Sequence, residues 1–222
     1  VIPARYNGLP VTSISNSAFD KNTIIKSIKI ANSVTSIGDS AFSECSSLYT
    51  IEMPNNLTSI GDFAFYKCDT LRYFTIPDSV INIGDSAFQG CSNIRQVAIP
   101  NSLKIISNST FQNCSSLENI NMFVGISRIG NKAFSGCRSL GSIYIPDSIT
   151  SIGSEAFYRC VSLGAISIPD SVTDIGDSAF KKCSNLRQAT IPGSVKNISN
   201  SMFYNCFLLE SVTMSAGILS IE

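Results

Sequence analysis

The stretch S-V-T-S-I-G-D-S-A-F-S-E-C, at residues 33–45, returns almost unchanged as S-V-T-D-I-G-D-S-A-F-K-K-C at residues 171–183. Related copies follow one another every 23 residues, without insertion or deletion between the phenylalanines that mark them. A fixed period of this length predicts a solenoid, in which each unit buries its apolar face by stacking on its neighbours. The phenylalanines that anchor the units are Phe19, Phe42, Phe65, Phe88, Phe111, Phe134, Phe157, Phe180 and Phe203.

The middle of each unit has the alternation of a half-buried strand. Ile51 and Met53, like Ile166 and Ile168, are apolar residues separated by a polar one, which is the period-2 pattern of a strand with one buried face. We therefore expect each unit to add one rung to a parallel sheet. Proline then ends the strand without leaving an unmet N–H group, at residues 54, 77, 100, 146, 169 and 192.

A second extended segment and a tight turn complete the predicted unit. V-T-S-I at residues 34–37 is β-branched and apolar at both ends, which favours a short strand on the opposite wall. Gly38 is expected to turn the chain, and Asp39 to cap a single helical or 3₁₀ turn over x-A-F-x-x-C. Asp or Asn recurs at this position in most units. Capping is its main interpretation, and metal binding is disfavoured because no second ligand recurs beside it.

These patterns predict one domain with no internal boundary. The fold class is a repeat solenoid, α/β or mainly β, of about nine 23-residue units over residues 1–222. The chain begins at Val1 without an initiator Met and stops inside a unit at Glu222. We therefore expect it to be a piece of a longer protein.

The eight cysteines keep the same period and lie three residues after a phenylalanine. An even number of cysteines suggests disulfides, but stacked copies in the same rotamer do not point at each other as the bond requires. A straight column of thiolates does not converge on zinc either. We expect a column of free, buried thiols that act as small hydrophobic groups, at residues 45, 68, 91, 114, 137, 160, 183 and 206.

Composition removes several functional classes. The 16 basic residues balance the 16 acidic ones, which disfavours a nucleic-acid or anionic-membrane partner. No apolar run is long enough to insert into a bilayer. The chain contains no histidine, the usual general base and the commonest metal ligand, and no phosphate-binding glycine loop. We therefore expect no enzymatic activity, no cofactor and no metal.

Every fourth unit departs from the pattern in the same way. Proline is replaced by Ala31, Phe123 and Ser215, and I-S-N-S replaces I-G-D-S at residues 14–17, 106–109 and 198–201. The array therefore resembles a tandem copy of a four-unit block. Drift between copies is the plainer explanation for differences within a block, and a role in surface chemistry is the alternative.

The repeat P-x-S-V-x-x-I-G-x-x-A-F-x-x-C closely resembles that of the BspA-like, or treponemal-type, leucine-rich repeat proteins. The likeness covers nearly the whole chain, although the start has five extra residues between Pro3 and Val11. The resemblance implies a right-handed horseshoe with a concave parallel sheet and short convex strands. It also implies a cell-surface or secreted location and a role in adhesion, and it brings no catalytic residues.

Solenoids often bind partners through their concave sheet. Tyrosine and arginine are the residue types enriched at binding hot spots. The candidate binding residues on this face are therefore Tyr49, Arg72, Tyr73, Arg95 and Tyr144. The alternative is an ordinary solvated sheet of Thr, Ser, Asn and Gln.

Three functional hypotheses follow from these observations. The first is a non-enzymatic adhesion module that binds a host matrix or cell-surface protein. The second is a structural spacer or stalk without a specific ligand, and the third is an intracellular interaction scaffold, which the free thiols would permit. The sequence leaves the ligand and the oligomeric state open.

Overall fold

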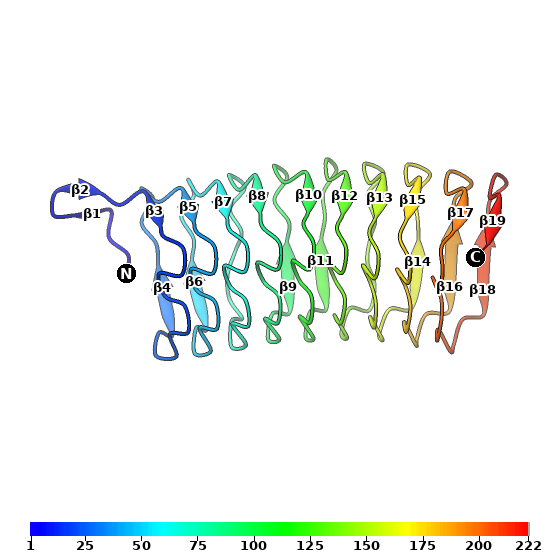
Figure 1. Ribbon diagram of the computed structural model, residues 1–222, viewed down its shortest axis with the longest axis horizontal. Helices are drawn as coiled ribbons and strands as arrows, with labels where there is room; N and C mark the ends of the chain where they lie inside the picture. The colour runs from blue at the N-terminus through cyan, green and yellow to red at the C-terminus, as the bar shows by residue number, and fades with distance from the viewer. Residues whose placement is uncertain (222) are drawn as a thin grey trace.

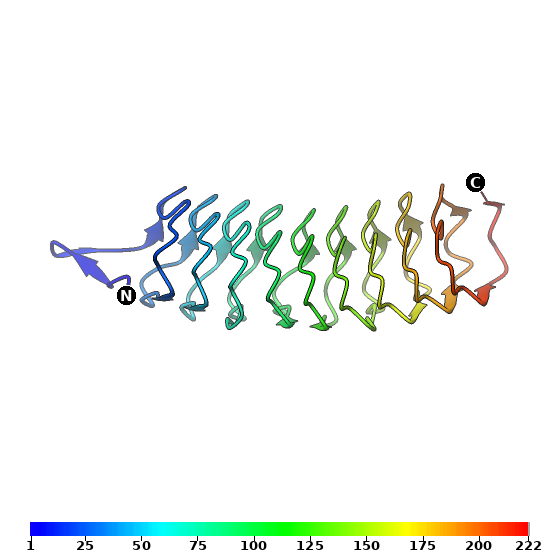
Figure 2. The same ribbon diagram turned by 90° about the horizontal axis from the view of Figure 1, so that it is seen from below.

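The computed structural model describes residues 1–221, which form one row of stacked coils with slight curvature (Figures 1 and 2). Each coil holds a two-residue strand and a turn segment around the phenylalanine, and most coils add a longer strand. We call the three resulting faces the short-strand wall, the turn wall and the long-strand wall. Strands of successive coils pair in parallel at a step of 23 residues, as in Ile28 with Ile51. The predicted solenoid of about nine 23-residue units is confirmed.

The long-strand wall is less continuous than the sequence predicts. Its strands are β4 (Ser27–Lys29), β6 (Thr50–Glu52), β9 (Gln96–Ala98), β11 (Asn119–Asn121), β14 (Ala165–Ser167), β16 (Gln188–Ile191) and β18 (Ser211–Met214). They form three separate sheets, β4-β6, β9-β11 and β14-β16-β18. The expectation of one rung per unit is wrong for two coils, because residues 74–76 and 142–145 form no strand. Tyr73 keeps a single bridge to Thr50.

The short-strand wall follows the four-unit period. Its strands are β3 (Ser13–Ile14), β5 (Ser36–Ile37), β7 (Ser59–Ile60), β8 (Asn82–Ile83), β10 (Ile105–Ile106), β12 (Arg128–Ile129), β13 (Ser151–Ile152), β15 (Asp174–Ile175), β17 (Asn197–Ile198) and β19 (Ser220–Ile221). They form the sheets β3-β5-β7-β8, β10-β12-β13-β15 and β17-β19. The sheet is thus interrupted where a unit with I-S-N-S follows a unit with I-G-D-S.

A serine hydroxyl accounts for part of this interruption. In a regular coil the backbone N–H of Gly84 donates to the carbonyl of Ile60 at 2.9 Å. At the first junction the Oγ of Ser107 instead donates to the carbonyl of Ile83 at 2.6 Å, and Ser199 does the same to Ile175. The second period in the sequence is therefore a structural period as well.

The turn wall contains no helix among residues 1–221. In the coil of Phe42 the N–H groups of Ser40, Phe42 and Glu44 donate to carbonyls of the next coil, at 2.8, 2.8 and 2.6 Å. Ser40 and Glu44 have φ of 54° and 53°, which takes the backbone out of the right-handed helical region. The expected helical or 3₁₀ turn is absent because alternate N–H groups bond to the next coil.

The aspartate before each turn holds the neighbouring coil and not its own turn. The Oδ1 of Asp39 accepts a hydrogen bond from the N–H of Asp62, one coil later, at 2.9 Å. Equivalent bonds run from Asn16 as far as Ser154.

The glycine that precedes this residue in the repeat also has a different role from the expected one. Gly61 does not have a positive φ, but a Cβ there would lie 2.4 Å from the Oδ1 of Asp39. Glycine is needed for the close approach of coils.

The nine phenylalanines form one uninterrupted column in the core. Consecutive ring centroids are 5.1 to 5.8 Å apart, and the ring planes are within 14° of parallel. The seven rings from Phe42 to Phe180 are fully buried. Burial of each ring contributes roughly 1.5–3 kcal/mol of transfer free energy, and close offset stacking adds to it.

The cysteines form a second column beside the rings. All eight are free, seven are buried, and Cys206 is half-buried. Each thiol donates a hydrogen bond to the carbonyl of a phenylalanine 26 residues earlier, as Cys91 does to Phe65 at 3.0 Å. Burial raises the pKa of the Cys160 thiol to about 12. The predicted burial of this column is confirmed, and the hydrogen bonds give the thiols a structural role that the sequence did not show.

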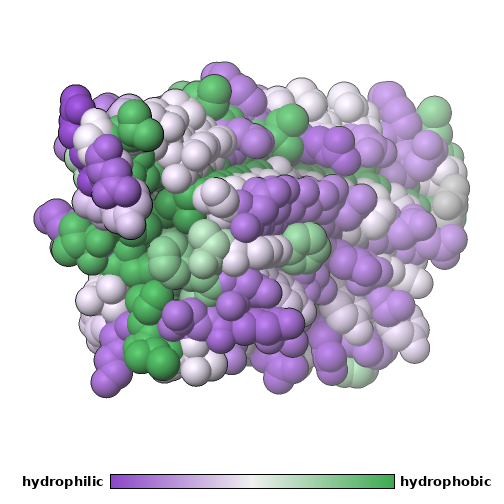
Figure 3. Space-filling model, turned by 60° about the vertical axis from the view of Figure 1, so that its left-hand side comes forward, coloured by the Kyte–Doolittle hydropathy of each residue, from purple (hydrophilic) through white to green (hydrophobic). Residues whose placement is uncertain are grey.

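The extra residues near the N-terminus form a hairpin. β1 (Arg5–Tyr6) pairs in an antiparallel manner with β2 (Leu9–Pro10), through a turn in which Asn7 and Gly8 have φ of 48° and 80°. That conformation suits an Asn-Gly hairpin turn. The hairpin points away from the row of coils (Figure 1), and apolar side chains gather at this end of the molecule (Figure 3).

Candidate functional site

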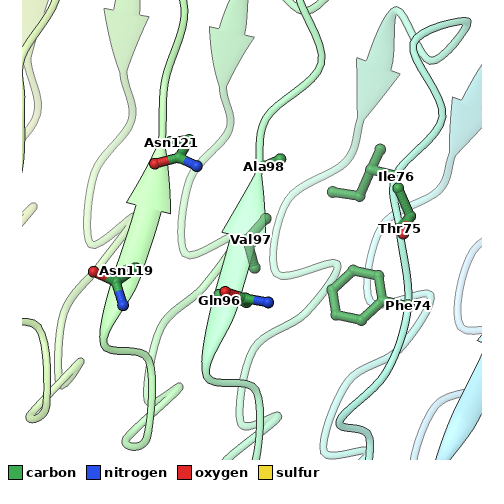
Figure 4. Close-up of a pocket in the computed structure, with 8 residues that line it drawn as sticks. All are labelled: Phe74, Thr75, Ile76, Gln96, Val97, Ala98, Asn119 and Asn121. Atoms are coloured by element: carbon green, nitrogen blue, oxygen red, sulfur yellow. The ribbon is translucent and has the colours of Figure 1, made fainter.

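The long-strand wall is hollowed where its sheet is interrupted. Three adjoining depressions of about 240, 570 and 240 Å³ lie on the coils from Thr50 to Asn121. We call them together the sheet hollow. Its floor and sides carry the ring of Phe74 and the amide side chains of Gln96, Asn119 and Asn121 (Figure 4).

Phe74 marks the first interruption of the wall, and we infer that its ring contributes to it. It stands where the neighbouring coils carry the smaller side chains of Ile51 and Val97. Its ring stacks on Phe88 at 5.1 Å with the planes 20° apart, and Figure 4 shows it extending from its segment toward the next coil. Phe74, Thr75 and Ile76 make no backbone hydrogen bond to either neighbouring coil.

Four of the five predicted binding residues lie together at one side of the sheet hollow. The rings of Tyr49 and Tyr73 meet edge to face at 5.2 Å, and the guanidinium of Arg72 lies 5.5 Å from the centre of the Tyr73 ring. Arg95 follows one coil later and forms an ion pair with Glu118 at 3.6 Å. Tyr49 and Tyr73 remain 44% and 53% exposed, so their ring surfaces are available to a ligand.

The polar groups of this cluster influence one another. The neighbouring Tyr73 hydroxyl is the main reason that the pKa of Tyr49 is raised, while Arg72 acts in the opposite direction. The Arg95–Glu118 pair is solvent-exposed, and such a pair contributes at most about 1 kcal/mol. A ligand can therefore displace Glu118 from Arg95 at low cost.

Tyr144, the fifth candidate, lies apart from the others. It belongs to the second interruption of the long-strand wall, beside Ile143 and Ile145, at a shallow depression of about 200 Å³. Its side chain is 64% exposed, and it lines none of the three depressions of the sheet hollow. The structure does not bring it together with Tyr49, Arg72, Tyr73 and Arg95.

Phe74 is the residue that the sequence analysis did not single out. The signal was present, because it is the only phenylalanine at the inward strand position where the other units carry Ile, Val or Ala. A core can often accommodate a phenylalanine in place of an aliphatic residue without a change in the backbone. Only the structure shows that the strand pairing is lost at this position. The sheet hollow offers ring faces, amides and guanidinium groups, which is the chemistry of a binding surface.

No group of three or more His, Cys, Asp or Glu side chains is placed to hold a metal ion within residues 1–221. No helix in that part of the chain is long and apolar enough to cross a membrane.

The stacked parallel strands, the phenylalanine column and the buried leucines define a leucine-rich repeat solenoid. A family model described as BspA type leucine rich repeat region matches residues 12–126 and 104–222. The chain belongs to this family, and the resemblance seen in the sequence is confirmed.

Solved structures of the same class superpose over most of the chain. A leucine-rich repeat protein from Bacteroides ovatus is 28% identical, with a TM-score of 0.62 over 99% of this chain and 70% of that one. The leucine rich repeat protein of T. pallidum is 29% identical, with a TM-score of 0.65 over 83% of this chain and 75% of that one. A leucine rich cell surface protein from Faecalibacterium prausnitzii is 24% identical and shares the fold, with a TM-score of 0.57 over 97% of this chain and 87% of that one. No curated protein matches the chain.

Proposed function

We propose that this chain is a non-enzymatic protein-binding module that acts at the cell surface or after secretion, and that the sheet hollow is its binding site. The main support for this proposal is that an open depression lies beside a cluster of tyrosine and arginine side chains, at Tyr49, Arg72, Tyr73 and Arg95. Clusters of this kind account for most of the binding free energy in protein interfaces.

Several further observations support a binding role. The long-strand wall is the face that solenoids commonly present to partners. The sequence lacks histidine altogether, so the usual proton-transfer and nucleophile-activating pairs cannot be assembled. A surface location is suggested by the F. prausnitzii protein, which shares the fold and is described as a cell surface protein. The proposed partner is a host matrix or cell-surface protein.

The test is a binding screen with matched variants. The chain would be immobilised and presented with purified extracellular-matrix proteins and with host-cell lysate, and enriched partners would be identified and titrated. The double variant Tyr73→Ala/Arg95→Ala should weaken binding of an enriched partner about tenfold or more, since hot-spot truncations cost 1–2 kcal/mol or more each.

A control on the same wall uses the same residue types. Tyr144→Ala/Arg187→Ala removes one tyrosine and one ion-paired arginine outside the sheet hollow and should leave the affinity within about twofold. Equal weakening by both double variants would move the site elsewhere on the wall. Consistent failure to enrich any partner would favour the spacer, in which the coils only extend the protein.

A further inference from the structure

The turn wall carries an uncompensated group of cations over three consecutive coils. The five residues after Phe134, Phe157 and Phe180 contribute four basic residues and no acidic one. The five residues after the first three anchoring phenylalanines contribute two basic and three acidic residues. A chain with no net charge therefore has a local excess of positive charge on one edge. We call it the basic edge, formed by Arg138, Tyr158, Arg159, Lys181, Lys182 and Tyr204.

The cations of the basic edge are positioned by aromatic rings. The guanidinium of Arg159 and the ammonium of Lys182 lie 5.8 and 5.5 Å from the centre of the Tyr158 ring. The ammonium of Lys181 lies 5.1 Å from the centre of the Tyr204 ring. Cation–π contacts of this kind hold charged side chains near one orientation, so less conformational entropy is lost when a ligand binds.

Backbone geometry fixes the spacing of these side chains. The N–H of Arg159 donates to the carbonyl of Lys181 at 2.9 Å, and the N–H of Lys182 donates to that of Tyr204 at 2.8 Å. Arg159 and Lys182 have φ of 60° and 63° and occupy the same position in successive coils. Two cations are thus held one coil apart, at roughly the 4.8 Å spacing of paired strands.

Several basic residues elsewhere on the molecule are paired with a carboxylate, and in the described part of the chain those of the basic edge are not. The four ion pairs of residues 1–221 all join a cation to a carboxylate 23 residues later, as in Lys29 with Glu52. None of these pairs includes a cation of the basic edge. Glu155, the nearest acidic residue along the chain from Arg159, is within 3.8 Å of Lys132. The cations of the basic edge therefore remain available to an anion from outside the chain.

We propose that the basic edge binds a sulfated glycan chain. Sulfate groups accept hydrogen bonds from both guanidinium and ammonium groups, and a chain that carries several of them can follow the row of cations from coil to coil. The half-buried ring of Tyr158 already has Arg159 and Lys182 near it, which leaves Tyr204, 56% exposed, as the one open ring of the basic edge, whereas single-stranded nucleic acids stack successive bases on several rings. The site lies on the turn wall and does not depend on the proposed function of the long-strand wall.

The experiment measures binding of heparin, as a sulfated glycan, by calorimetry at low and moderate salt. Arg159→Gln/Lys182→Gln should weaken binding about tenfold or more, because hydrogen bonds to charged groups contribute roughly 1.5–3 kcal/mol each. The matched control is Lys21→Gln/Lys67→Gln, which removes two cations from the equivalent position of other coils. It should change the affinity by less than about twofold.

Three outcomes would overturn the proposal. One is equal weakening by the two double variants, which would show a diffuse charge effect. Another is equal binding of chemically desulfated heparin. The third is tighter binding of poly-glutamate or single-stranded DNA of matched charge, which would assign the edge to another class of polyanion. Melting curves of the variants should coincide with that of the parent chain, since the substituted side chains are not in the core.

Discussion

The core column of phenylalanines and the long-strand wall respond differently to the same 23-residue period. The rings stack without interruption from Phe19 to Phe203, whereas the sheet on the long-strand wall is broken at residues 74–76 and 142–145. The coils stay in register across both breaks, because the core, the turn wall and the short-strand wall continue to join them. The core, the turn wall and the short-strand wall therefore maintain the stacking at these two places, and the long-strand wall is the face that varies.

The largest expected effect on stability comes from removal of one ring from the phenylalanine column. Phe111→Ala removes a fully buried ring from the middle of the array and should destabilise the protein by about 3–5 kcal/mol. Tyr144→Ala, at an exposed position of the long-strand wall, should cost less than about 0.5 kcal/mol. Thermal or urea unfolding followed by circular dichroism measures both. Equal shifts would contradict the division of roles between core and wall.

The thiol column gives an alkaline limit to stability. Burial raises the pKa of Cys160 to about 12 from 9.0, so above pH 9 the unfolded chain releases a proton that the folded chain retains. The stability is fully present below pH 9 and falls as pH rises toward the folded pKa, by up to about 1.4 kcal/mol per pH unit for each such thiol.

The measurement is the urea midpoint between pH 8 and pH 10.5 for the parent chain and for Cys160→Ala. The variant should be less stable at pH 8 and should lose stability less steeply above pH 9. A slope that is the same in both chains would show that this thiol ionises freely in the folded state.

The junctions of the four-unit blocks should be sensitive to one hydroxyl. Ser107→Ala leaves the carbonyl of Ile83 without the hydrogen bond that it accepts from the Ser107 hydroxyl, at a cost of about 1 kcal/mol. Ser107→Ala should therefore lower the unfolding midpoint. Ser102→Ala removes a hydroxyl that bonds to Val80 across the same junction, and it measures the cost of a side-chain hydrogen bond that other coils also make. If Ser107→Ala were neutral by chemical denaturation, the hydroxyl would not replace the lost backbone bond.

The variant at the sheet hollow should have the most local effect. Phe74→Ile restores the aliphatic residue found in neighbouring coils and should change stability by no more than about 1.5 kcal/mol. Its consequence should be local, with amide hydrogen exchange slowed at residues 74–76 as the strand pairs again. Loss of the Phe74–Phe88 contact without slower exchange would show that another residue keeps the wall open.

The sequence predicted the solenoid, its period and its buried columns because those features repeat in every unit. It misassigned the turn segment, because inter-coil hydrogen bonds of Ser40 and Glu44 outweigh local helix formation. It also misjudged Asp39 and Gly61, whose roles lie between coils.

For the candidate site, residue type alone pointed to Tyr49, Arg72, Tyr73 and Arg95, and also to Tyr144. Only the structure could show the hollow at Phe74, because opening of the wall depends on how one ring fits between two coils.

Amide hydrogen exchange, resolved by residue, tests the stacking of coils most directly. The backbone N–H of Phe42, Phe65, Phe88 and Phe111 each donates to a carbonyl of the next coil, whereas Phe74, Thr75 and Ile76 have no such partner. We predict strong protection of the four phenylalanine amides and fast exchange at residues 74–76. Phenylalanine amides that exchange as fast as those of an unfolded peptide would contradict coil-on-coil stacking.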